Sequence, residues 1–137
     1  MSSREAVAQG FYDSLKAMRT VKLGVVNRDP IIPEELPKTG FPAVSIASMN
    51  EDRVRLTNSM GEGTLQVELN LFVQGKNRDV QLNTLIDGID QKLAEDRTLN
   101  NSVKDLVLTR IEAIQSGEAA PYASVRLIYQ VVYCYTM

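Results

Sequence analysis

The order of elements in this chain is decided by residues 79–114, which read DVQLNTLIDGIDQKLAEDRTLNNSVKDLVLTRIEAI. In the first half of this stretch, apolar residues recur at intervals of three and four positions, which predicts an amphipathic helix with Asp79 as a suitable N-cap. The core-facing stripe of that helix is Leu82, Leu85, Ile86, Ile89 and Leu93. A polar connector at 97–102 and a strand at 103–115 follow, and this strand carries apolar residues on both faces. The stretch therefore predicts a helix that leads directly into one strand of a sheet.

The segments before this stretch predict a second helix and further strands. Residues 4–19 have helical periodicity, and Ser2 and Glu5 are spaced as an N-terminal capping box. The apolar stripe of this helix is Val7, Phe11, Leu15 and Met18. Strands are expected, in chain order, at residues 21–26, 41–48 and 64–74.

The strand at 64–74 alternates between apolar and polar residues, with Phe72 as the one break in the polar row. Such alternation indicates a strand with one buried and one wet face, which is typical of an antiparallel sheet. The last strand, at 122–136, places Tyr129, Tyr133 and Tyr135 on its core face. We therefore expect an α+β fold in a single domain over residues 1–137: one mainly antiparallel β-sheet with two α-helices packed on one face, in the order α-β-β-β-α-β-β.

Two long loops are expected, at about 27–40 and 50–63. The first contains three prolines, which lack N–H donors, and so cannot be a central strand. The second contains a short or irregular strand at 53–60 and a flexible tip at its glycines. We expect the two loops to emerge near one another and to dock like subunits through opposite charges, although ordinary solvated charge explains the same residues. The candidate contact residues are Arg28, Ile31, Ile32, Glu34, Glu35, Arg53, Arg55 and Glu62.

Composition argues against several classes of function. The chain has 137 residues, a net charge of −2, a single cysteine and no histidine. A negative balance is untypical of nucleic-acid binders, and the scarcity of Cys and His argues against a zinc or haem site. No phosphate loop, nucleophile elbow or dinucleotide fingerprint occurs, so we expect no catalytic, cofactor-binding or metal-binding residues and no enzyme activity. No signal peptide and no apolar run that would span a membrane is found, so we expect a soluble, intracellular chain without a membrane partner.

Two motifs resemble those of a known family. The first is Phe41-Pro42-Ala43-Val44 at the start of a strand. The second is the helix ending near Leu93 followed by EDRTLNNSV at 95–103. This second motif resembles the "helix, Asp-Xaa-Thr-Leu-Xaa-Xaa-Xaa-Val, strand" signature of tail-terminator proteins of long-tailed bacteriophages, also called minor tail or tail-completion proteins. It departs from the family in having Asn100-Asn101 where relatives often show glycine.

The resemblance implies a structural protein of the virion. Members of that family assemble into a ring, commonly a homo-hexamer, that caps the tail tube, ends tube polymerisation and offers a surface to the head or neck. The implied partners are therefore other copies of the chain, the tail-tube protein and a head-completion or neck protein. The ring would surround the DNA passage without binding a specific nucleic acid. The implied location is the host cytoplasm during assembly and the tail or neck of the virion afterwards.

An alternative reading comes from another class of protein. Two helices against a sheet also occur in small RNA-binding α/β modules of the ribosome-associated type. The acidic balance of the chain and the absence of a glycine-rich phosphate clamp count against it. An enzyme of unknown type is the least favoured interpretation, because histidine and catalytic motifs are missing.

Overall fold

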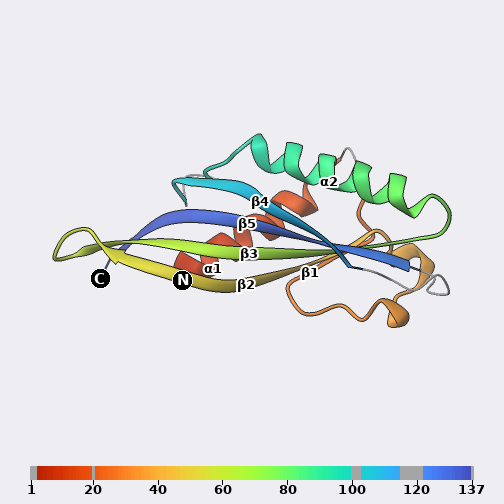
Figure 1. Ribbon diagram of the computed structural model, residues 1–137, viewed down its shortest axis with the longest axis horizontal. Helices are drawn as coiled ribbons and strands as arrows, with labels where there is room; N and C mark the ends of the chain where they lie inside the picture. Colours follow the sequence, from red (N-terminus) through yellow and green to blue (C-terminus); the bar gives the residue numbers. More distant parts are fainter. Residues whose placement is uncertain (1–2, 20, 100–102, 115–121, 137) are drawn as a thin grey trace.

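A computed structural model describes residues 3–19, 21–99, 103–114 and 122–136 of the chain (Figure 1). Its helices and strands are α1 (Ser3–Lys16), β1 (Val25–Asn27), β2 (Ala43–Arg55), β3 (Met60–Gln74), α2 (Arg78–Ala94), β4 (Asp105–Ile114) and β5 (Tyr122–Thr136). Two short 3-10 turns, Pro33–Glu35 and Lys38–Gly40, interrupt the loop between β1 and β2. The predicted α+β class and the α-β-β-β-α-β-β order are confirmed.

The strands form one sheet in the order β1-β2-β3-β5-β4. The pairs β2–β3, β3–β5 and β4–β5 are antiparallel, so the prediction of a mainly antiparallel sheet is confirmed. The short β1 is the exception, because it runs parallel to residues 43–45 of β2. The strand predicted at 21–26 is wrong in extent: Val21 and Leu23 pack beside the core instead, and the backbone N–H of Gly24 donates to the carbonyl oxygen of Pro42 at 2.8 Å.

Both helices cover the same face of the sheet, as the alternation of β3 predicts. The apolar residues of β3 on that face are fully buried; they are Leu65, Val67, Leu69, Leu71 and Val73. Tyr129 of β5 joins the two helices. Its ring meets Phe11 of α1 edge to face, with the ring centroids 5.6 Å apart, and its hydroxyl donates to Asp90 of α2 at 2.9 Å. Burial of the ring, together with the nearby Asp90 carboxylate, raises the pKa of Tyr129 far above its usual value.

The predicted helical stripes are buried except for Leu82 and Ile86, which are partly buried, and both helix boundaries differ from the prediction. Helix α1 ends at Lys16 rather than at residue 19. Helix α2 begins two residues earlier than expected, because its N-cap is Asn77 rather than Asp79; Asn77 has a left-handed conformation and makes no side-chain capping bond. Asp79 therefore lies within the first turn, where its negative charge suits the helix dipole. Ser2, half of the expected capping box, lies outside the described residues, and Glu5 is an ion-pair partner of Arg28.

The connector after α2 is locked by local hydrogen bonds. Asp96 accepts bonds from both the backbone N–H and the hydroxyl of Thr98, at 3.2 and 2.7 Å. Leu99 then adopts a left-handed backbone with φ of 46° and is 5% exposed. It packs against α1 at Gly10, where a methyl group would lie 3.2 Å from the Leu99 Cβ. The motif residues Asp96, Thr98 and Leu99 therefore fix the conformation of the chain just after α2.

The expectation of a long loop at 50–63 is wrong. These residues form a hairpin, here called the arm, in which β2 extends to Arg55 and β3 begins at Met60. The turn is closed by the backbone N–H groups of Leu56 and Thr57, which donate to the carbonyl oxygen of Met60 at 2.9 and 3.0 Å. The glycines that suggested a flexible tip lie inside β3, where Gly61 pairs with Tyr135 and Gly63 pairs with Tyr133. Aromatic side chains cover these glycines and offset the weakness that glycine brings to a strand.

Candidate functional site

The arm is held rigidly at its base by the C-terminal half of β5. The ring of Tyr135 lies between Gly61 and the guanidinium of Arg53, whose central carbon is 4.4 Å from the ring centroid. A Cβ atom at Gly61 would lie 2.5 Å from the Tyr135 hydroxyl oxygen, so a larger residue there would have to push the ring aside. The neighbouring Tyr133 is fully buried, and its hydroxyl donates to the carboxylate of Glu51. The arm is thus an ordered projection of the sheet.

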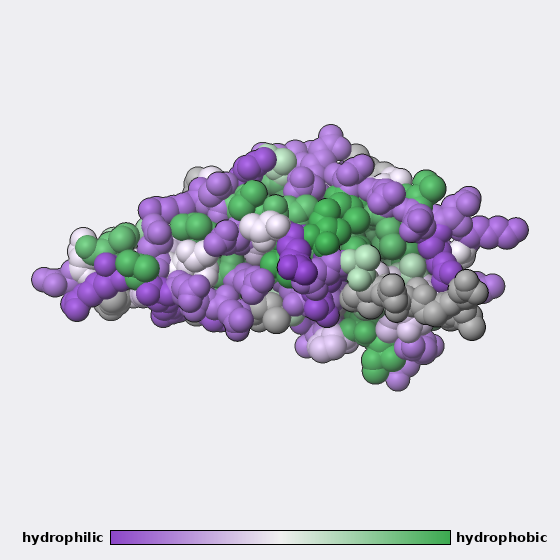
Figure 2. All heavy atoms as spheres, in the orientation of Figure 1, coloured by the Kyte–Doolittle hydropathy of each residue, from purple (hydrophilic) through white to green (hydrophobic). Residues whose placement is uncertain are grey.

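The tip of the arm exposes large apolar side chains. Val54 is 61% exposed, Leu56 50% and Met60 40%. Figure 2 shows this hydrophobic group at the left-hand tip, apart from the larger hydrophobic area over the middle of the molecule. A rigid projection with clustered apolar side chains is typical of a protein-binding element, because binding hides the apolar surface without a large ordering cost.

The charged candidates of the arm are engaged in ion pairs or local hydrogen bonds. Arg53 pairs with Glu51, and this carboxylate raises the pKa of Arg53. Arg55 is exposed, and its Nε donates to the carbonyl oxygen of Thr57 at 3.3 Å. Glu62 accepts a bond from the Lys104 ammonium at 2.8 Å, which raises the pKa of Lys104. Of Arg53, Arg55 and Glu62, Arg55 is the one for which the structure gives no ion-pair partner among the described residues.

Some candidate residues of the proline-rich loop bind other elements of the domain, and others are exposed to solvent. Arg28 binds the carboxylate of Glu5 on α1 with both terminal nitrogens, one of them at 2.7 Å, and this lowers the pKa of Glu5. Glu34 accepts a bond from the Tyr122 hydroxyl at 2.5 Å, which lowers the pKa of Glu34. Ile31 is half-buried, whereas Ile32 is 54% exposed.

The two candidate segments do not lie near one another. The proline-rich loop lies beside the end of β3, where Gln74 donates to the carbonyl oxygen of Lys38 at 3.3 Å. The tip of the arm adjoins Met60 at the other end of the same strand. At about 3.3 Å per residue, the two ends of β3 are separated by about 45 Å. Figure 1 shows them at opposite ends of the long axis. Docking between Glu34 or Glu35 and the arm would therefore require two copies of the chain.

The face of the sheet that carries no helix has many polar side chains beside apolar ones such as Val107. Thr64, Gln66 and Gln130 line a hollow of about 640 Å³ on this face, together with Asn50, Glu51, Asp52 and Thr109. Further along the same face, Arg126 binds Glu68 at 2.6 Å and Glu112 at 3.4 Å. Glu68 is only 8% exposed, so this ion pair is partly withdrawn from water.

The arrangement of the basic side chains bears on the RNA-binding alternative. Arg28, Arg53, Lys104 and Arg126 each lie against a carboxylate of the same chain. A cation that is already paired gains less from a phosphate, because its counterion must first be displaced. These pairs weigh against a phosphate-binding surface at those positions.

Comparisons with known proteins give a likeness at the level of the fold. No model of a known protein family and no curated protein matches the chain. Among solved structures, the chain is similar to a chain of the structure described as "Virion of native gene transfer agent (GTA) particle". The TM-score is 0.55, the sequence identity is 13%, and the match covers 96% of each chain. The two chains therefore share a fold over nearly their whole length.

Sequence reasoning missed several exposed apolar residues. Val54, Leu56 and Met60 lie in a segment whose alternation was visible but was interrupted by glycines. Val107 and Ile111 of β4 are 44% and 51% exposed, although the sequence pattern marks them as residues of a strand with two apolar faces. The signal for β4 was present in the sequence, but its position at the sheet edge was not.

Among the described residues, no helix has the length and apolar character needed to cross a membrane.

Proposed function

We propose that this chain is a structural, non-enzymatic virion protein that assembles into a ring, caps the tail tube, ends tube polymerisation and joins the tail to the head or neck. The observation that carries the proposal is the fold likeness over 96% of both chains to a component of a virion particle. The family signature supports the same assignment independently, because its residues Asp96, Thr98 and Leu99 are hydrogen-bonded or buried just after α2.

The surface features of the chain suit an assembly role. The arm offers an ordered apolar tip at one end, and the proline-rich loop offers Ile32, Glu34 and Glu35 at the other. Different surfaces at opposite ends favour a head-to-tail contact between identical copies, and such contacts close into a ring when the rotation between copies permits it. The ring is a homo-hexamer in this proposal, as the family resemblance implies. Its polar, helix-free sheet face lines the DNA passage or meets a neighbour.

Assembly with the tail-tube protein of the same virus tests this function. Light scattering after size exclusion and negative-stain images should show rings, either with the chain alone or when tube protein is added. Leu56→Ser at the tip of the arm should weaken capping or ring formation, because a contact loses apolar area. The matched control is Val80→Ser on α2, since Val80 is 64% exposed but lies away from the arm. A strict monomer under both conditions would refute the proposal of ring assembly. Equal assembly of the two variants would show that the arm takes no part in the contacts of the ring.

A further inference from the structure

Strand β4 is an edge strand that carries apolar residues on both faces, beside the charged Asp105, Arg110 and Glu112 and a register irregularity between Leu108 and Arg110. It pairs with β5 on one side, and no described strand pairs with it on the other. Its register places Val107 beside Gln130 on the helix-free face and Ile111 beside Leu127 on the helix-covered face. Both side chains are large, apolar and close to half exposed. Apolar residues on both faces are typical of strands buried within a sheet, whereas open edges are usually protected by charge, proline or short length.

A second open edge lies on the opposite side of the sheet. Strand β1 pairs only with residues 43–45 of β2. Since β2 continues to Arg55, its outer edge at 46–55 has no strand partner among the described residues. That edge is ten residues long, from 46 to 55 inclusive, and β4 is also ten residues long. The two open edges are therefore equal in length.

The directions of the two edges are compatible with pairing between copies. Three successive antiparallel pairings separate β2 from β4, so these two strands run in opposite directions within one chain. A second copy placed beside the first by rotation presents its β2 antiparallel to the β4 of the first. Such a contact uses different surfaces on the two copies, and repeated rotation pairs both of these edges in every copy once a ring closes.

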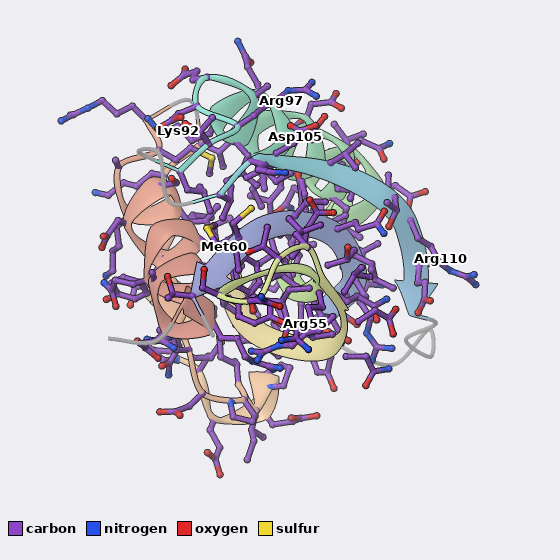
Figure 3. All side chains as sticks on the ribbon, turned by 90° about the vertical axis from the view of Figure 1, so that its left-hand side faces the viewer. Arg55, Met60, Lys92, Arg97, Asp105 and Arg110 are labelled. Atoms are coloured by element: carbon purple, nitrogen blue, oxygen red, sulfur yellow. The ribbon has the colours of Figure 1, made fainter. Side chains whose placement is uncertain are left out.

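We propose that β4 of one copy pairs with residues 46–55 of β2 in a second copy, so that the sheets of neighbouring subunits become continuous. This inference rests on the ring proposed above and names the contact that would build it. Full overlap of the two edges in antiparallel register places Asp105 opposite Arg55, which joins opposite charges. Figure 3 looks onto the arm end of the molecule, with Arg55 on the arm and Asp105 at the start of β4, while Arg110 projects outward further along β4.

A charge swap tests the register. Asp105→Arg and Arg55→Asp should each raise the concentration needed for half-assembly about tenfold, since each places like charges opposite one another. The double variant should restore assembly to within about threefold of the original chain. Asp87→Arg is the matched control, because Asp87 is exposed on α2 and makes the same change in charge away from both edges. Far-UV circular dichroism and the thermal midpoint check that each variant is folded.

A disulfide test gives an answer that does not depend on charge. Within one chain, Asp105 and Arg55 are separated by three strand spacings, about 14 Å, which is beyond the Cα separation of about 7 Å that a disulfide spans. Arg55→Cys with Asp105→Cys, in a Cys134→Ser background, should therefore form only links between copies, visible as a ladder on a non-reducing gel. Arg55→Cys with Asp87→Cys should give no ladder.

The outcomes separate the two proposals. Charge rescue together with the ladder supports edge pairing. If rings form but the double charge variant does not restore assembly and no disulfide ladder appears, the edge pairing is refuted while the proposal of a ring is retained. A chain that stays monomeric even with tube protein overturns the proposed function, and the edge pairing with it.

Discussion

Leu99 offers a quantitative test of how the family signature works. Its side chain is buried against α1, while its backbone occupies the left-handed region with φ of 46°. A buried leucine contributes through packing, but a non-glycine residue in this region carries strain. Two substitutions separate these effects: Leu99→Ala removes packing and keeps the strain, whereas Leu99→Gly removes both.

The expected magnitudes follow from the burial and the backbone. Truncation of a buried leucine to alanine costs about 3 kcal/mol of unfolding free energy, since the helix above can relax only in part. In the left-handed region alanine is strained by about 1–2 kcal/mol relative to glycine. Glycine has more conformational freedom in the unfolded chain, which lowers the unfolding free energy by about 0.4–1 kcal/mol relative to alanine and offsets part of that gain. Leu99→Gly should therefore be more stable than Leu99→Ala by about 0.5–1 kcal/mol. At an ordinary position the order would be reversed.

Urea unfolding followed by far-UV circular dichroism measures both differences, at concentrations low enough to keep the chain monomeric. Leu56→Ala is the control, because Leu56 is half exposed at the tip of the arm and should change the free energy by no more than about 0.5 kcal/mol. A cost below about 1 kcal/mol for Leu99→Ala would show that Leu99 does not lock the connector. A Leu99→Gly variant less stable than Leu99→Ala would refute the assignment of backbone strain.

The remaining predictions concern the arm and the proline-rich loop. Gly61→Val should displace the Tyr135 ring from Arg53 and speed amide hydrogen exchange across 50–63, because a Cβ at Gly61 would lie 2.5 Å from the Tyr135 hydroxyl oxygen. Ser59→Val at the exposed tip is the control. Equal rates of exchange in both variants would contradict the packing argument. Glu5→Gln should lose the ion pair with Arg28. Since this pair lowers the pKa of Glu5 below its usual 4.5, its stabilisation is present above about pH 4.5 and is lost as the pH falls through the lowered value. The difference in stability between the original chain and Glu5→Gln should therefore narrow as the pH falls below about 4.5, and a difference that stays constant through this acid range would rule out this pair as its source.

The buried faces of the regular elements were predictable because their signals are local. Alternation in β3 and helical spacing in α2 depend only on residues a few positions apart, and Leu69 and Ile89 are buried as predicted. The arm was not predictable in this way. Gly61 and Gly63 weaken a strand when judged by their neighbours alone, but Tyr135 and Tyr133, more than sixty residues later in the chain, cover them.

The candidate site shows the same limit. Sequence reasoning selected Arg28 as a contact residue because it lies in a long loop, yet its guanidinium is held by Glu5, 23 residues earlier. It selected Arg53 and Arg55 as contact residues of a long loop, but could not tell that both lie in a hairpin or that Arg53 is paired with Glu51 and stacked on Tyr135. Side-chain partners between distant elements are set by the packing of the sheet.

The sequence by itself determined the class of the fold, the order of its elements and the faces that are buried, because hydrophobic periodicity records how each segment meets the core. Only the tertiary structure decided which strand lies at an edge and which segments lie at opposite ends of the molecule. Strand β4 carries apolar residues on both faces, and the strand order leaves one of its edges open. Strand pairing is non-local, so the same residues that specify a strand do not specify what lies beside it.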